Sequence, residues 1–284
     1  MVALVTGHRG FLGRRVVAQL EAAGLVVIGA GRPEVEIPSG AFDRVLDETL
    51  PDLVVHCAGP ASVPASVEDP AADRQGSVEV TSELVASLLR RSDPPRLLLV
   101  SSAAVYGEPA RLPIAETVAP APISPYGRHR LEVEELVRGG SLPSAIVRIF
   151  SAYGEGLRRQ LLWDIAQQAD AGPVELWGTG EESRDFVHVD DVAGAIAVVC
   201  EASSFGGEVV NVASGVETTV ATVARMLLRE LGVEDAPHFT GVARTGDPER
   251  WQADVTRLAA LGFEPKVTLE EGIARYAHWI RTSA

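Results

Sequence analysis

The fold is decided by one glycine-rich turn, Thr6-Gly7-His8-Arg9-Gly10-Phe11-Leu12-Gly13. An apolar run over residues 2–5 precedes this turn and is typical of a buried strand. Apolar residues recur at helical spacing over 16–23, so a helix is expected to follow the turn. Glycines placed in this way allow a tight bend, a close approach of backbone to a pyrophosphate, and close packing of helix on strand. The helix N-terminus adds free N–H groups and a positive dipole end, so we expect a dinucleotide-binding turn.

Composition and charge restrict the class of protein. The 284 residues have room for about two domains, or for one large domain with an added lobe. A net charge of −14 argues against non-specific binding to nucleic acid. No apolar run reaches the roughly 18 residues of a membrane helix, and a strand from residue 2 leaves no room for a signal peptide. We therefore expect a cytoplasmic protein that binds neither nucleic acid nor membrane. Cys57 and Cys200 lie in apolar segments and are expected to be buried free thiols, and no metal site is expected.

The first half of the chain alternates expected strands with expected helices. Strands are expected over 25–28, 35–37 (Val35-Glu36-Ile37), 52–58, 96–101, 145–149 and 209–212, and helices over 78–91, 126–137, 190–201, 220–231 and 269–280. Such an alternation implies a parallel sheet with right-handed crossovers. We predict an α/β fold in which residues 1–150 plus 188–214 form a Rossmann-like, doubly wound parallel sheet. Residues 151–187 plus 215–284 are expected to form a smaller α/β substrate lobe.

Further motifs follow the glycine turn in a fixed order. They are His56-Cys57-Ala58-Gly59, Ser101-Ser102-Ala103-Ala104-Val105-Tyr106-Gly107, Pro125-Tyr126-Gly127-Arg128-His129-Arg130, Arg148-Ile149-Phe150-Ser151-Ala152-Tyr153-Gly154 and Arg184-Asp185-Phe186-Val187-His188-Val189-Asp190-Asp191. Over nearly the whole chain, this series resembles the extended short-chain dehydrogenase/reductase family of NAD(P)-dependent sugar-nucleotide epimerases, dehydratases and reductases. The resemblance implies a homodimer with the cofactor on the sheet domain and a nucleotide-diphosphate sugar on the lobe. It implies that the cofactor contacts the residues of the glycine turn, Cys57, Ala58, Gly59, Tyr126 and Arg130.

The end of the second expected strand bears on the choice of cofactor. Family members that use NAD usually carry an Asp there, which binds the adenosine ribose, whereas this strand runs into Gly29-Ala30-Gly31-Arg32. A carboxylate would repel a 2′-phosphate, and an arginine can hold one with two hydrogen bonds. The pairing of Arg9 with Arg32 resembles that of the NADP(H)-dependent GDP-fucose synthase. We therefore expect NADP(H), with NAD(H) as the second choice.

A tyrosine and a cation one helical turn apart are the expected catalytic group. Tyr126 and Arg130 lie four residues apart, so both can reach one nicotinamide ribose from the same helix face. By resemblance, the Tyr126 phenol exchanges a proton with the substrate oxygen while hydride moves, and Ser102 hydrogen-bonds that oxygen. The family has lysine where this chain has Arg130; arginine keeps the charge but cannot relay a proton.

The remaining motif residues separate one reaction from another. By resemblance, Arg184 and Arg244 hold the substrate diphosphate, and Ser151 replaces an Asn that contacts substrate. His188 and Asp190 are expected to be structural, as a cap on the next helix. The dehydratases carry Asp-Glu directly after the catalytic serine or threonine, where this chain has Ala103 and Ala104, which transfer no proton.

These residues predict hydride transfer with a single tyrosine acid. The expected reaction is NADPH-dependent reduction of a nucleotide-linked 4-keto-6-deoxy-hexose, as in deoxysugar biosynthesis. Asp164, the remaining acid/base candidate in its segment, is expected to face solvent. The alternatives are an NAD-dependent 4-epimerase of the UDP-glucose type and a catalytically impaired NADP-binding protein.

Overall fold

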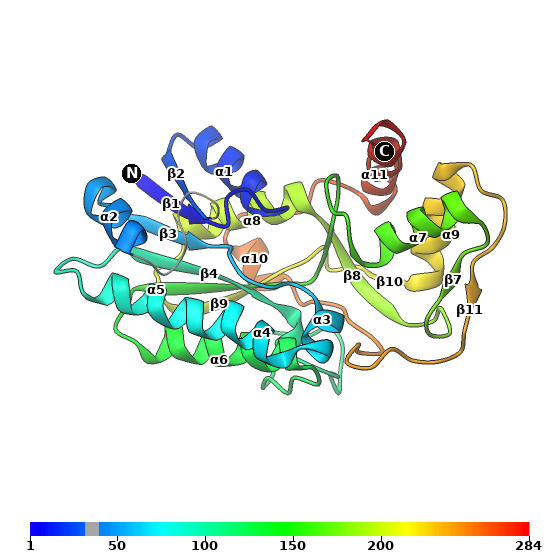
Figure 1. Ribbon diagram of the computed structural model, residues 1–284, viewed down its shortest axis with the longest axis horizontal. Coiled ribbons are helices and arrows are strands. Elements are labelled where there is room, and N and C mark those ends of the chain that lie inside the picture. Colours follow the sequence, from blue (N-terminus) through cyan, green and yellow to red (C-terminus); the bar gives the residue numbers. More distant parts are fainter. Residues whose placement is uncertain (32–39, 284) are drawn as a thin grey trace.

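A six-stranded sheet forms the centre of the computed structural model, which describes residues 1–31 and 40–283 (Figure 1). Its strand order is β2-β1-β3-β4-β5-β9, and every neighbouring pair is parallel. The strands are β1 (Val2–Thr6), β2 (Val26–Ala30), β3 (Leu53–His56), β4 (Arg96–Ser102), β5 (Ser144–Ile149) and β9 (Gly206–Val212). The predicted parallel sheet is thereby confirmed. The short strand expected over 35–37 and Arg32 lie outside the described residues.

Helices cover both faces of this sheet, as Figure 1 shows. Helices α1 (Gly13–Ala22) and α8 (Val189–Ala202) bury Val16, Leu20 and Val192 against one face, with α10 (Thr256–Ala260) beside them. Helices α2 (Gly40–Thr49), α5 (Val80–Leu89) and α6 (Pro125–Gly139) bury Phe42 and Leu84 against the other. Successive strand residues point to opposite faces, so each strand contributes to both cores.

The segment between β3 and α5 differs from the expected pattern. The helix predicted over 78–91 begins as a π-helix (Gln75–Glu79) that continues into α5. Two short helices that were not predicted, α3 (Val63–Glu68) and α4 (Pro70–Arg74), come before it. Each has proline in its first turn, and the side chains of Ser62 and Asp69 accept hydrogen bonds from their first turns as N-caps.

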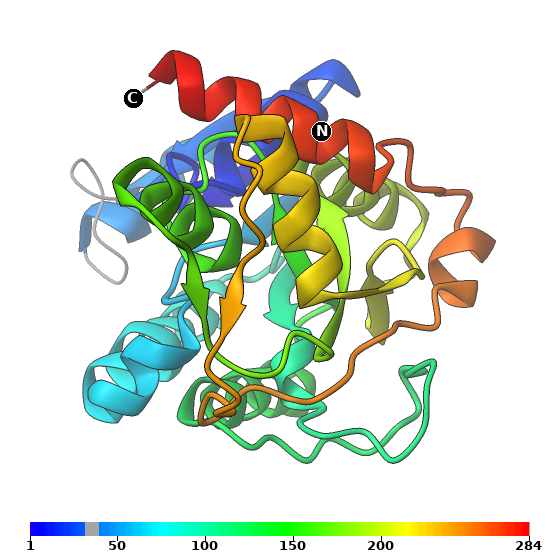
Figure 2. The same ribbon diagram turned by 90° about the vertical axis from the view of Figure 1, so that its right-hand side faces the viewer.

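A smaller α/β lobe lies beside the large sheet, and Figure 2 views the molecule from its side. It contains a three-stranded sheet, β10 (Glu217–Thr219), β8 (Ser183–His188) and β6 (Ser151–Tyr153), and a pair, β11 (His238–Phe239) and β7 (Glu175–Leu176). Helices α7 (Gln160–Ala171), α9 (Val220–Leu231) and α11 (Leu269–Ser283) enclose its core. Within the described residues, no helix is long and apolar enough to cross a membrane.

Candidate active site

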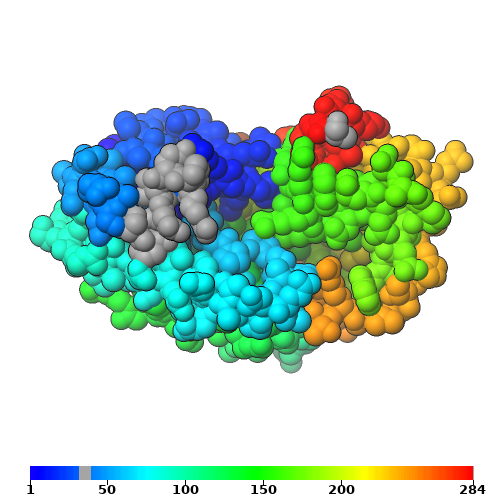
Figure 3. Space-filling model, in the orientation of Figure 1, coloured from blue at the N-terminus to red at the C-terminus, as the bar shows by residue number. Residues whose placement is uncertain are grey.

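A cleft of about 1640 Å³ lies at the carboxyl ends of β1, β3 and β4, facing the lobe. Strands β2 and β3 flank β1 on opposite sides, and open α/β sheets bind ligands at such a switch point. Figure 3 shows the face on which the N-terminal part of the chain, in blue and cyan, meets the green and orange lobe. The cleft is lined by every described residue predicted for the site: Gly7, His8, Arg9, Gly10, Phe11, Leu12, Gly13, Cys57, Ala58, Gly59, Ser102, Tyr126, Arg130, Ser151, Arg184 and Arg244.

The glycine turn is too tightly packed to hold side chains at its first and third glycines. A Cβ on Gly13 would lie 2.1 Å from the carbonyl oxygen of Gly7, and one on Gly7 would lie 2.9 Å from the Ala58 backbone. Gly7 also has a φ of +66°, and its carbonyl accepts a hydrogen bond from the Gly10 N–H. The N-cap residue of α1, Leu12, makes no side-chain capping bond to the helix. This cradle fits a dinucleotide pyrophosphate, which would supply the missing acceptors.

Gly13→Ala should weaken binding of NADPH by about ten- to a hundredfold, because the turn must open to admit the methyl group. Gly139→Ala is the matched control, since a Cβ there meets nothing within 4 Å. Titration of nucleotide fluorescence measures both. Unchanged affinity in Gly13→Ala would contradict the assignment of the cradle.

The segment that follows β3 forms the floor of the cleft. Cys57, Ala58 and Gly59 all line it, and Gly59 has a φ of +133°. Burial raises the pKa of Cys57 and of Cys200 to about 12. Both cysteines are free, as predicted; Cys200 is buried, but Cys57 is only half-buried because it follows β3 into the cleft.

The position expected to carry an acid in NAD-dependent members is a glycine. Gly31 directly follows β2 and lines the cleft, near the imidazole of His8. Nε of Arg9 donates a hydrogen bond of 3.3 Å to Nε2 of His8. Arg32, which is predicted to hold a 2′-phosphate, lies outside the described residues.

Tyr126, Arg130 and Ser102 all line the cleft, on the wall where Tyr126 packs in one buried cluster with Ala103 and Ala104, the two residues after Ser102. Tyr126 stands in the first turn of α6; its N–H donates to Oγ of Ser66 at 3.0 Å, and Ser124 caps the helix. Ser102 ends β4, and its Oγ accepts a hydrogen bond of 3.2 Å from the Ala104 N–H. The α-helical spacing therefore places the Tyr126 ring and the Arg130 guanidinium on the same side of α6, where both line the cleft.

The Arg130 guanidinium is nearly buried beneath this wall. It lies 5.2 Å from the centre of the Tyr126 ring, and its Nη2 donates to the Pro60 carbonyl. Its Nε is buried without a hydrogen-bond partner among the described residues. Burial, aided by the charge of Arg130, lowers the pKa of His56 to about 3, so that histidine stays neutral. An orphaned donor on this wall fits a ribose hydroxyl.

The opposite side of the cleft belongs to the lobe and carries two arginines. Nη1 of Arg184 donates to the Ser183 carbonyl at 2.8 Å, and Nη2 lies 3.9 Å from Asp247. Arg244 also lines the cleft. Burial raises the pKa of Asp164, and the positive charge of Arg244 opposes this rise. Asp164 is exposed, as expected, but the space it faces is the cleft.

An apolar wall joins the predicted catalytic residues to Arg184. Ala104, Tyr126, Phe150 and Trp251 belong to one buried cluster that reaches the cleft. The rings of Phe150 and Trp251 lie 5.9 Å apart, and the Arg184 guanidinium lies 5.7 Å from the Trp251 ring. Trp251 was not predicted for the site. No sequence motif around Trp251 predicts its place at the cleft. Its Nε1 donates a hydrogen bond to the Gly107 carbonyl, which positions the ring.

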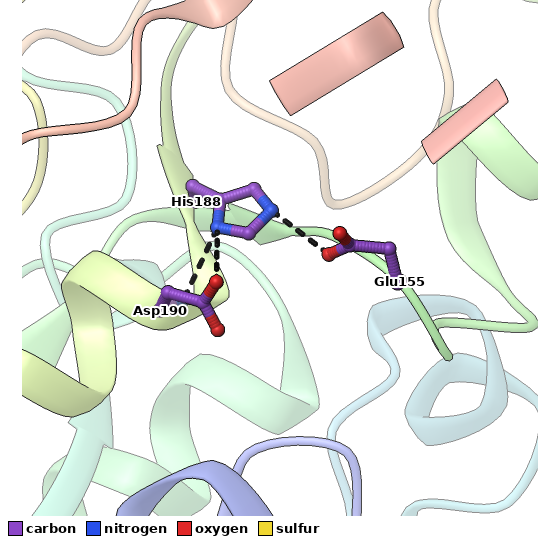
Figure 4. A group of neighbouring side chains, drawn as sticks. All are labelled: Glu155, His188 and Asp190. Carbon is purple, nitrogen blue, oxygen red and sulfur yellow. Dashed lines mark hydrogen bonds and ion pairs between the residues drawn. The ribbon is translucent and has the colours of Figure 1, made fainter. Parts of the chain in front are cut away.

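His188 is structural, as predicted. Its Nδ1 accepts a hydrogen bond from the Asp190 N–H and caps α8 (Figure 4). Glu155, His188 and Asp190 offer ligand atoms within 4.8 Å of one another, a spacing that could suit a metal ion. However, Arg15 and Arg275 pair with both carboxylates. Because two guanidinium groups already balance the two acids, the cluster is an ion-pair network that ties α1, α8 and α11 together.

Acid should weaken this network once Glu155 takes up a proton. Burial alone would raise the Glu155 pKa, but hydrogen bonds from His188 and Arg275 outweigh burial and lower it to about 2. A depressed pKa stabilises the folded state above the unfolded value of about 4.3, and this contribution disappears as the pH falls toward 2. Glu155→Gln should therefore lose less stability than the unmodified protein across that pH range in urea titrations. An identical loss in both proteins would contradict the role of Glu155.

Comparisons with known proteins agree with this site. Residues 3–213 match the NAD dependent epimerase/dehydratase family. The UDP-glucose 4-epimerase of Azospirillum brasilense is 32% identical over 98% of this chain and 92% of its own. Two solved structures cover at least 99% of both chains: UDP-glucose 4-epimerase with UDP-glucose from Thermotoga maritima (TM-score 0.89, 28% identity) and RMD from Pseudomonas aeruginosa complexed with NADPH (0.83, 27%). The predicted resemblance is confirmed, and the chain belongs to the NAD-dependent epimerase/dehydratase family of enzymes.

Proposed function

We propose that this enzyme reduces the 4-keto group of a nucleotide-diphosphate-linked 4-keto-6-deoxy-hexose with NADPH. The observation that carries the proposal is the wall formed by Ser102, Tyr126 and Arg130, with alanines at 103 and 104. The wall offers one proton donor for a carbonyl oxygen. It lacks the Asp-Glu pair with which dehydratases move protons at neighbouring carbons.

Each residue of this wall has a distinct task in the reduction. The nicotinamide, when bound, supplies the hydride. Tyr126 donates its phenolic proton to the C4 oxygen, and Ser102 donates a hydrogen bond to the same oxygen. Arg130 holds the nicotinamide ribose through its orphaned Nε–H, and its fixed charge stabilises the phenolate left on Tyr126.

The lobe supports the substrate class. Arg184 and Arg244 would bind the diphosphate, with Ser151 near the sugar. The apolar wall that includes Ala104 and Trp251 offers a surface on which the C6 methyl group of such a sugar can pack.

Cofactor choice rests on the end of β2. Gly31 takes the place of the acid that would bind the adenosine ribose of NAD, and Arg9 of the glycine turn lines the same cleft. A similar solved structure, RMD, was obtained with NADPH, whereas several other similar structures contain NAD. The missing acid and the structure with NADPH support NADP(H), whereas the structures with NAD keep NAD(H) as the second choice. The contact predicted between Arg32 and the 2′-phosphate belongs to this proposal.

A 4-epimerase is the second candidate, favoured by the 32% identity to a UDP-glucose 4-epimerase. It needs the same serine, tyrosine and cation, but it keeps NAD bound through a full catalytic cycle. Mass spectrometry of the nucleotide released from denatured protein distinguishes the reductase from the epimerase. A reductase should release little cofactor and consume one NADPH per ketone; stoichiometric NAD with no net consumption would favour the epimerase. Cofactor binding without turnover of any keto-sugar nucleotide would favour the remaining alternative, a catalytically impaired NADP-binding protein.

The organisation of the chain completes the proposal. The sheet domain would comprise residues 1–150 plus 188–214, and the substrate lobe 151–187 plus 215–284. A cytoplasmic homodimer is expected, and light scattering of the purified protein tests the dimer.

A further inference from the structure

A histidine in the glycine turn carries a buried nitrogen that the proposed reaction does not use. Nδ1 of His8 has no hydrogen-bond partner among the described residues, although it is shielded from solvent. The ring lies against β2: a Cβ on Gly29 would come within 2.4 Å of its Cδ2 atom. Glycine at position 29 therefore makes room for an imidazole at this place in the cleft.

The neighbouring arginine fixes which ring nitrogen of His8 carries the proton. Nε of Arg9 is a donor only, and it points at Nε2 of His8 from 3.3 Å. Nε2 must therefore accept, which leaves the proton of the neutral ring on Nδ1. His8 thus presents a buried N–H donor whose acceptor is missing, and a buried donor without an acceptor is unfavourable.

The direction of this donor indicates the missing acceptor. Nδ1 of His8 lies 3.6 Å from the point where a Cβ on Gly31 would stand. Gly31 follows β2, where a doubly wound nucleotide-binding sheet meets the 2′ position of the adenosine ribose. Gly31 offers no side-chain oxygen and no described residue bonds to Nδ1 of His8, so a bound ligand is a candidate source of the acceptor.

We propose that Nδ1–H of His8 donates to the 2′-phosphate of NADP(H) and makes His8 a determinant of cofactor specificity. The inference rests on the proposed NADPH-dependent function. A phosphate is a charged acceptor and binds an N–H more strongly than a ribose hydroxyl does. Arg9 then has two tasks: it brings positive charge to the site and fixes the tautomer of His8.

The test uses the adenosine half of the cofactor, so that hydride transfer plays no part. Calorimetry on the full chain compares 2′,5′-ADP with 5′-AMP, and the ratio of their affinities isolates the 2′-phosphate. His8→Phe keeps a ring but removes the donor, and should lower the ratio about tenfold or more. His8→Asn places an amide N–H near the position of Nδ1 and should keep most of the ratio. His8→Gln places its amide near the position of Nε2 and should behave like His8→Phe.

The possible results distinguish the role of His8 from the choice of NADP(H) as cofactor. If the unmodified protein prefers 2′,5′-ADP and His8→Phe keeps the full preference, the role of His8 is wrong while the choice of NADP(H) stands. If the unmodified protein binds both nucleotides equally, the proposed cofactor fails, and His8 as its determinant fails with it. Should His8→Phe not fold, the Asn and Gln variants still decide, because equal ratios in those two would overturn the proposal. Gly29→Ala, which drives a methyl group into the imidazole, should lower the ratio as His8→Phe does.

Discussion

Tyr126→Phe should lower kcat by about a hundred- to ten-thousandfold, the range that a positioned general acid contributes. The substitution keeps the ring, so its packing beside Arg130 and its place in the first turn of α6 remain. Binding of NADPH should change little, because only the phenolic hydroxyl is lost. Stopped-flow measurement of NADPH oxidation and fluorescence titration of NADPH give the two quantities separately.

The matched control is Tyr276→Phe. That hydroxyl donates to the Leu157 carbonyl at 2.6 Å in the core of the lobe. Its removal should cost about 1 kcal/mol of stability and leave kcat unchanged. Equal losses of kcat in both variants, or full activity in Tyr126→Phe, would remove Tyr126 from the mechanism. Arg130→Lys extends the test: it restores the cation of the family and should retain turnover or raise it.

Arg148→Met should destabilise the fold by about 3–5 kcal/mol, the largest expected effect on stability. Arg148 of β5 and Glu134 of α6 form an ion pair of 2.6 Å, with side chains only 2% and 1% exposed. Glu134 also accepts a hydrogen bond from Oγ of Ser101, and the guanidinium lies 4.7 Å from the Tyr106 ring. Removal of Arg148 leaves a carboxylate buried without its cation, which is the source of the cost.

The double variant Glu134→Leu with Arg148→Met is the control, since it removes both charges. It should unfold at a higher urea concentration than Arg148→Met alone, because a buried pair replaced by apolar groups is often nearly neutral. If the loss of stability in the double variant equals the sum of the losses in Glu134→Leu and Arg148→Met, the two residues act independently. The ion pair would then not be what anchors α6.

Local patterns in the sequence predicted the parts of this site that depend on local spacing. The glycine turn needs only residues 7–13 to specify its bend, and Tyr126 and Arg130 share a face because α-helices place residues four apart together. For this reason the main sheet and six of the longer helices were predicted, whereas α2 (Gly40–Thr49) and α7 (Gln160–Ala171) were not. The short helices α3 and α4 were missed because five or six residues do not show a full helical period.

Contacts between distant segments could not be predicted in this way. Glu155 meets Arg275 across 120 residues, and Trp251 meets Gly107 across 144. The orphaned Nδ1 of His8 depends on the packing of its ring over Gly29, which no sequence period encodes. Such features follow from the fold as a whole, and the sequence alone supplied only the residue types.

Transfer of label from the cofactor tests the central claim most directly. The enzyme is given a 4-keto-6-deoxy-hexose nucleotide and NADPH deuterated on the face of the nicotinamide from which hydride is taken, each face being tried in turn. Mass and NMR spectra of the product then locate the deuterium. We expect one deuterium at C4 per NADPH consumed. In a parallel reaction in deuterated water, no enzyme-dependent deuterium should enter C3 or C5. Product without deuterium at C4, or enzyme-dependent exchange at C3 or C5, would contradict reduction at C4 by a single tyrosine acid.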